Sequence, residues 1–172
     1  MLTRQISFSA PIFVIVFLVQ EAGLNQFKLP GGGFSLFVIF ALVWAIMSTP
    51  EIAALSGFAA GILMDLSQSS DGPFGQWTLI MVIVCYGVSY LGYGDSNING
   101  NPIGVVFFVV IANLASEVIF IASGVLLGVS TGSFGQTLLV LLGNSVWTLV
   151  VTPIVLPIFS YLHGLIFEKR AK

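Results

Sequence analysis

Charge is what this chain lacks most. Only 7% of its 172 residues are charged and 57% are apolar, whereas about a quarter of the residues in a typical soluble domain are charged. The formal net charge of -2 at pH 7 also excludes a strongly basic surface of the kind that binds nucleic acid or anionic lipid headgroups. The composition therefore predicts an integral membrane protein.

Residues that ligate metals or act as nucleophiles are also scarce. The single cysteine, Cys85, lies in an apolar run, so it has no disulfide partner and is expected to be a small apolar group. The single histidine, His163, has no second ligand nearby in the sequence, so it predicts no metal site and is expected at a membrane interface.

One catalytic pattern occurs by letter only. Gly128 to Gly132 reads G-x-S-x-G, but a nucleophile elbow needs a strand-to-helix turn and a nearby histidine and acid. The segment is expected to be a turn. No enzymatic activity, no metal and no cofactor is predicted.

Apolar stretches broken by Gly, Pro, Asn and charge predict about six transmembrane helices. A spanning helix needs roughly 20 mostly apolar residues, and the chain has room for about six with no separate soluble domain. The expected fold class is an all-α membrane protein, a single domain over residues 1–172. Its helices are expected at 8–23, 34–48, 51–66, 74–92, 103–129 and 134–167.

Prolines refine this picture. Pro50 fits the first turn of a helix, so a tight hairpin is expected between the second and third segments. Both segments are short, so we expect them to tilt little or to sit deep, shielded by neighbouring helices. Pro153 and Pro157 are expected to kink or bend the last, longest helix.

The few basic residues predict the orientation. One precedes the first span, three follow the last, and one lies between spans: Arg4, then Lys169, Arg170 and Lys172, and Lys28. Because cytoplasmic segments are enriched in Lys and Arg, both termini are expected in the cytoplasm. Tryptophans are candidates for the aromatic belts at the membrane interfaces, namely Trp44, Trp77 and, at a deeper position that also suits core packing or a pocket wall, Trp147.

The third helix carries small residues at every fourth position, ending in an acid. Ala53, Gly57, Gly61 and Asp65 therefore share one face. Small residues let another helix approach closely in a membrane. The other helix belongs either to this chain or to a partner, and the spacing alone leaves both alternatives open.

Glu117 is the one carboxylate expected in the middle of a span. An ionised carboxylate at the bilayer centre costs on the order of 3 kcal/mol, so such groups usually face a bundle interior. Asn113 lies one turn earlier, and Asn144 on the last helix is a second candidate partner. We expect an intramembrane polar cluster, with a structural glutamate, a ligand or partner contact, or a proton relay as its alternatives.

The segment from Gly57 to Leu79 resembles the signature region of the MreD family, a small membrane component of bacterial rod-shape and cell-wall elongation systems. The resemblance lies in Gly57-Phe58, Gly61, Asp65-Leu66, Pro73, Gly75 and Leu79, followed by Val84, Tyr86 and Gly87. The family often has an Arg-Pro-Asp-like entry to its second span. This chain has Pro30-Gly31-Gly32-Gly33 there.

The resemblance implies a six-helix bundle similar to the substrate-binding subunits of energy-coupling-factor vitamin transporters. It also implies a non-enzymatic scaffold in the bacterial cytoplasmic membrane that binds MreC, within an assembly of RodA-type enzymes and MreB-type filaments. Its motif positions are expected to be structural, with Asp65 accepting backbone hydrogen bonds at its helix end: Gly57, Gly61, Asp65, Pro73 and Gly75.

The alternative function is a vitamin-binding transporter subunit. It would need a closed pocket with converging polar groups, and the candidates for such groups are Asn113, Glu117, Asn144 and Trp147.

Overall fold

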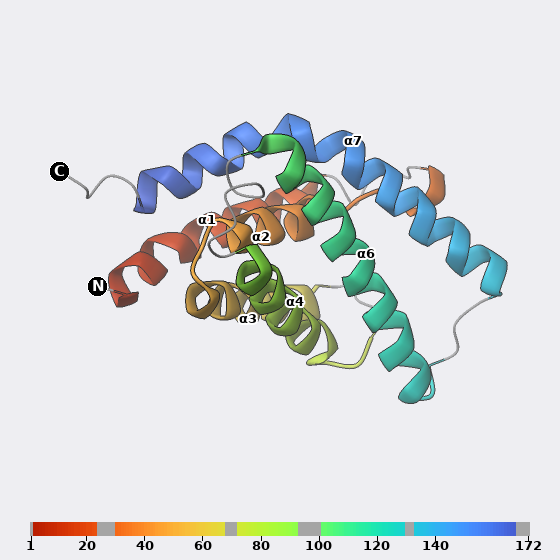
Figure 1. The fold of residues 1–172 in the computed structure, drawn as a ribbon. Helices are drawn as coiled ribbons and strands as arrows, with labels where there is room; N and C mark the ends of the chain where they lie inside the picture. The colour runs from red at the N-terminus through yellow and green to blue at the C-terminus, as the bar shows by residue number, and fades with distance from the viewer. Residues whose placement is uncertain (1, 24–29, 68–71, 93–100, 130–132, 168–172) are drawn as a thin grey trace.

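The computed structural model describes residues 2–23, 30–67, 72–92, 101–129 and 133–167, and within them it is entirely helical (Figure 1). Six α-helices and one short 3-10 turn make up this part of the chain: α1 Leu2–Ala22, η2 Pro30–Gly32, α2 Leu36–Ile46, α3 Pro50–Asp65, α4 Gln76–Gly92, α6 Pro102–Leu126 and α7 Phe134–Phe167. The predicted all-α class is confirmed.

Helix ends differ modestly from those expected. α1 begins at Leu2 rather than Phe8, and α2 ends at Ile46 rather than Ser48. Thr49 and Pro50 occupy the N-cap and first position of α3, so the tight connection expected there is confirmed. Several predictions concern residues outside the described ranges: the basic residues Lys28, Lys169, Arg170 and Lys172, and the Ser130–Gly132 part of the G-x-S-x-G match.

α2 is the central helix of the molecule. Every residue from Phe37 to Ile46 is at most 3% exposed, and α2 contacts α1, α3, α4, α6 and α7. A helix that is apolar on all sides is a buried helix. Its first turn is capped from two sides, because Gln20 Oε1 accepts a hydrogen bond from Leu36 N at 2.8 Å and Ser35 Oγ accepts one from Val38 N at 3.3 Å.

Aromatic rings fill the contact between α1, α2 and α7. Phe13 packs edge-on against Phe40 at 4.8 Å and Trp44 at 5.6 Å, and Phe40 meets Phe159 at 5.0 Å between ring centroids. Such pairs contribute about 0.5–1.5 kcal/mol each beyond the buried area. Trp44 is only 1% exposed, so its predicted place in an interfacial belt is wrong. Cys85 is buried.

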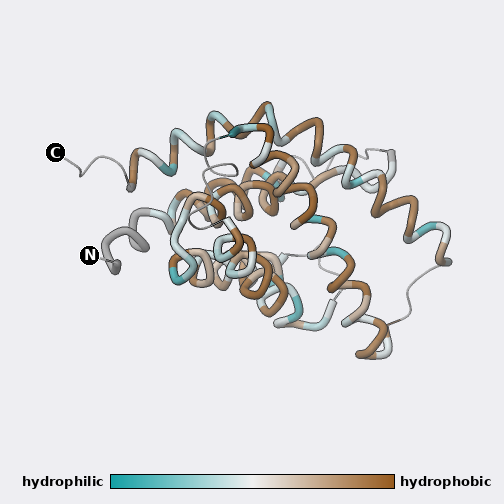
Figure 2. The backbone as a smooth tube through the Cα atoms, viewed as in Figure 1, coloured by the Kyte–Doolittle hydropathy of each residue, from teal (hydrophilic) through white to brown (hydrophobic). Residues whose placement is uncertain are grey.

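α6 and α7 are the helices, among the described residues, that are long and apolar enough to cross a membrane, over Pro102–Leu126 and Phe134–Ile166. Figure 2 shows hydrophobic residues along most of both helices. α7 remains one helix through Pro153 and Pro157 and follows a bent path (Figure 1). Its outer side chains are exposed, including Leu139, Leu142, Val146, Val150, Ile154 and Ile158.

The end of α1, the start of α2, the end of α3 and the start of α4 meet at one end of the bundle. Gln20, Ser35, Ser67 and Trp77, one from each of these places, line a common cavity of about 230 Å³. Successive helices therefore run in alternating directions, as in an up-and-down bundle.

At the other end of the bundle, polar contacts connect Ser48, which follows α2, to α4 and α7. Ser89 Oγ, near the end of α4, donates to Ser48 O at 2.6 Å, and Ser48 Oγ lies 3.1 Å from His163 Nε2 on α7. His163 is 6% exposed and its ring also contacts Trp44, so its side chain is buried in the bundle at this end. The start of α1 and the end of α7 lie on the same side of the molecule (Figure 1).

Candidate functional site

Asp65 connects the end of α3 to the start of α4. Its Oδ1 accepts a hydrogen bond from Trp77 N at 3.0 Å, and its Oδ2 accepts from Thr78 N at 3.0 Å and from Thr78 Oγ1. The first N–H groups of a helix have no partner within that helix, and a negative charge is stabilising there. Asp65 therefore caps the following helix across the intervening loop.

Gly57 and Gly61 bring α3 against α4. A Cβ atom on Gly57 would lie 2.9 Å from Cys85 Cβ, and one on Gly61 would lie 2.8 Å from Thr78 N. Both distances are too short for a real Cβ atom. The second is to a backbone nitrogen, which cannot move aside as a flexible side chain could. This small face, which continues to the buried Ala53, is therefore occupied by a helix of the same chain rather than by a partner.

Pro73 and Gly75 shape the connection into α4. Pro73 O accepts a hydrogen bond from Gln76 N at 3.1 Å. Gly75 has a φ of 94°, a conformation that glycine adopts readily and other residues do not. The motif positions Gly57, Gly61, Asp65, Pro73 and Gly75 thus all belong to one α3–α4 hairpin.

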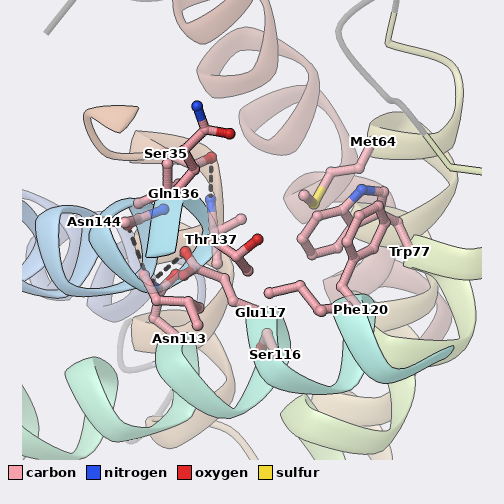
Figure 3. A pocket seen from close by; sticks show the side chains of 14 residues that line it. Ser35, Met64, Trp77, Asn113, Ser116, Glu117, Phe120, Gln136, Thr137 and Asn144 are labelled. Atoms are coloured by element: carbon pink, nitrogen blue, oxygen red, sulfur yellow. Dashed lines mark hydrogen bonds between the residues drawn. The ribbon is translucent and has the colours of Figure 1, made fainter. Parts of the chain in front are cut away.

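Asn113, Glu117 and Asn144 meet where α6 crosses α7 (Figure 3). Asn113 Nδ2 donates to Glu117 Oε1 and to Asn144 Oδ1, both at 3.2 Å, and Thr148 Oγ1 donates to Asn144 Oδ1 at 3.1 Å. Glu117 Oε2 is buried and has no hydrogen-bond partner among the described residues. The sequence singled out these three residues separately, and the structure brings them together.

A cavity of about 450 Å³ opens beside this cluster, within the range of small-molecule sites. Figure 3 shows Asn113 and Glu117 on one side of it and Met64, Trp77 and Phe120 on the other. The rings of Trp77 and Phe120 stack at 4.6 Å. The lining comes from α2, α3, α4, α6 and α7 and the residue before α2: Ser35, Val38, Met64, Trp77, Asn113, Ser116, Glu117, Phe120, Ile121, Gln136, Thr137, Val140, Leu141 and Asn144.

Trp147 does not reach this cavity and instead packs against Phe34, with ring centroids 6.3 Å apart. The structure therefore removes Trp147 from the candidate pocket residues. The tryptophan that lines the cavity is Trp77.

Two contacts near the site escaped the sequence analysis. Gln76 Nε2 donates to Phe120 O at 2.8 Å and to Ser123 Oγ at 2.7 Å, joining α4 to α6. Gly143 of α7 lies against Gly31, where a Cβ on Gly143 would be 2.7 Å from Gly31 Cα. The run of three glycines was a signal for special backbone geometry, because Gly31 has a φ of 75°, but nothing in the sequence paired it with Gly143.

Comparisons with protein-family models, curated proteins and solved structures found no match to this chain. The fold and the site define an all-α protein with two helices apolar and long enough to cross a membrane. Among the described residues there is no group of three or more His, Cys, Asp or Glu side chains that could hold a metal ion.

Proposed function

We propose that this chain is a non-enzymatic membrane scaffold of the bacterial cell-shape and peptidoglycan elongation machinery and that it binds MreC through transmembrane helix faces. RodA-type enzymes and MreB-type filaments would then be indirect partners. The observation that carries the proposal is the α3–α4 hairpin. The residues that resemble the MreD signature form a structural unit, in which Asp65 caps α4 and Gly61 packs on it.

In this proposal the chain crosses the cytoplasmic membrane six times. α2 has 11 residues, so it is about 16 Å long, against a hydrocarbon thickness of about 30 Å. Five helices surround α2, and non-helical backbone is tolerated at membrane depth where protein covers it. The flanking segments can therefore complete the crossing inside the bundle. If all six α-helices cross the membrane, their alternating directions place both termini on one side.

The outer face of α4 is the surface that we assign to MreC. Ile83, Tyr86 and Tyr90 are exposed there, and a Cβ on Gly87 would meet nothing within 4 Å. These four positions follow the i, i+3, i+4, i+7 spacing of one helix face. A small residue between aromatic ones leaves a notch into which a partner helix can pack closely.

Replacement of Gly87 by Leu tests this assignment. The variant should fold normally because the space around Gly87 is open, whereas recovery of co-expressed MreC on an affinity-tagged chain should fall at least about tenfold, the equivalent of about 1.4 kcal/mol. The matched control enlarges an exposed side chain on a different helix. Leu139→Phe, on the exposed face of α7, should leave recovery unchanged. Full recovery of MreC with Gly87→Leu would refute the assignment of the α4 face to MreC. No recovery of MreC with the unmodified chain would refute the scaffold function.

The cavity beside Glu117 favours a second candidate function, the substrate-binding subunit of a vitamin transporter. Its size and its converging polar groups fit a small ligand. Uptake of a labelled vitamin by cells that express the chain together with an energy-coupling module distinguishes the two functions. Uptake that disappears in Glu117→Gln would favour the transporter, and the absence of uptake for every vitamin would leave the scaffold.

A further inference from the structure

The cavity beside Glu117 has one polar end whose hydrogen bonds are incomplete. Glu117 Oε1 accepts from Asn113, but Glu117 Oε2 is buried and lacks a partner among the described residues. A buried polar atom without a hydrogen bond costs about 1–3 kcal/mol. A ligand that donates a hydrogen bond to Glu117 Oε2 would remove this cost.

The charge of the lining favours a cation over an anion. Among the described lining residues, Glu117 is the one ionisable acid, and none is Lys, Arg or His. A bound carboxylate or phosphate would face Glu117 without a compensating positive charge, whereas a bound ammonium would pair with it. Pairing matters more in an apolar cavity than in water, because charges interact more strongly at low dielectric constant.

The other end of the cavity is lined by large apolar side chains. Met64, Trp77 and Phe120 face Glu117 across the cavity (Figure 3). Aromatic rings prefer to pack against other rings in offset or edge-on arrangements. An ammonium and a ring on one small molecule would therefore meet complementary groups at the two ends.

We propose that this cavity binds a compact aromatic amine, with its ammonium group at Glu117 and its ring beside Trp77 and Phe120. The site goes beyond the scaffold function and does not depend on MreC.

Three probes that share one ring test the proposal. They are 2-phenylethylamine, 2-phenylethanol and 3-phenylpropanoate, which carry a positive, a neutral and a negative group. Calorimetric titration into the purified chain in phosphatidylcholine nanodiscs should give saturable binding of the amine, at least about tenfold tighter than the alcohol, and no binding of the carboxylate. Equal binding of the amine and the alcohol, or no saturable binding, would overturn the proposal.

Matched variants locate the binding. Glu117→Gln should reduce the affinity for the amine to that for the alcohol, while Glu51→Gln, at an exposed position on α3, should change nothing. Thr137→Trp should block the cavity, and Leu139→Trp, on the exposed face of the same helix, should not. Gln136→Trp, also in the lining, replaces Thr137→Trp if that variant loses its helical signal.

Unchanged amine binding in Glu117→Gln, or in both cavity-blocking variants, would place the ligand elsewhere and overturn the proposal. The titration contains no MreC, so its failure is distinguishable from failure of the scaffold function.

Discussion

Asp65 illustrates how one side chain can determine the geometry of two helices. It lies at the end of α3, yet all three of its described hydrogen bonds go to Trp77 and Thr78 in the first turn of α4. We expected Asp65 to accept backbone hydrogen bonds at the end of its own helix. It accepts backbone hydrogen bonds, but from the start of the next helix, because the loop folds α4 back onto α3.

Asp65→Ala should destabilise the protein by about 1–3 kcal/mol, since it leaves helix N–H groups without their acceptor. Thermal unfolding in mild detergent, followed by circular dichroism, measures the effect. Asp65→Asn retains one acceptor oxygen and should fall between Ala and the unmodified chain. An unfolding midpoint for Asp65→Ala equal to that of the unmodified chain would show that the cap contributes nothing.

Glu117 differs from Asp65, because the hydrogen bond that it accepts from Asn113 does not require a negative charge. Glu117→Gln keeps an oxygen for Asn113 Nδ2 and should leave folding and MreC association nearly intact. Glu117→Leu removes that acceptor and should destabilise the bundle by about 1–3 kcal/mol. The same unfolding measurement applies, and a Gln variant as unstable as the Leu variant would show that the carboxylate itself is required for folding.

At the scale of helices, the close contact between α3 and α4 depends on two glycines. Gly61→Ala and Gly57→Ala should each lower the unfolding midpoint, because their new methyl groups would overlap with α4. Gly87→Ala is the matched control on α4, where the space is open. It should be neutral or raise stability by up to about 1 kcal/mol, because alanine favours helix more than glycine does. Equal effects at all three positions would contradict the packing argument.

The helices themselves were predictable because each is an apolar run between breaks, and Pro50 marked the start of α3. Which face of each helix is buried was less predictable. α2 is apolar all round, so its residue pattern indicates no preferred face, and Trp44 was assigned to an interface although it lies in the core. The contact between Gly31 and Gly143 joins segments far apart in the chain, and local pattern carries no information about such a pairing.

At the scale of the whole molecule, alternating helix directions place the start of α1 and the end of α7 on one side (Figure 1). A reporter active only in the cytoplasm, fused after Lys172, should therefore give a signal, as the distribution of basic residues also predicts. The same fusion with a reporter active only outside the cytoplasm is the control and should be silent. The reverse result would contradict six spans with both termini inside.

The candidate site could be predicted only in part. Glu117 and Asn113 lie one turn apart on one helix, so their contact follows from helix geometry. The wall formed by Met64, Trp77 and Phe120 comes from three helices, and its position depends on how α3, α4 and α6 pack. The cavity is thus a property of the assembled bundle rather than of any one segment.

The central claim is that the outer face of α4 binds MreC in the membrane, and photo-crosslinking in cells tests it most directly. A photoreactive phenylalanine derivative is placed at Ile83 or Tyr90 on α4, or at Leu139 or Leu142 on α7, all of which are exposed. We predict crosslinks to MreC from both α4 positions and from neither α7 position. Crosslinks from α7 alone, or from none of the four, would contradict the account.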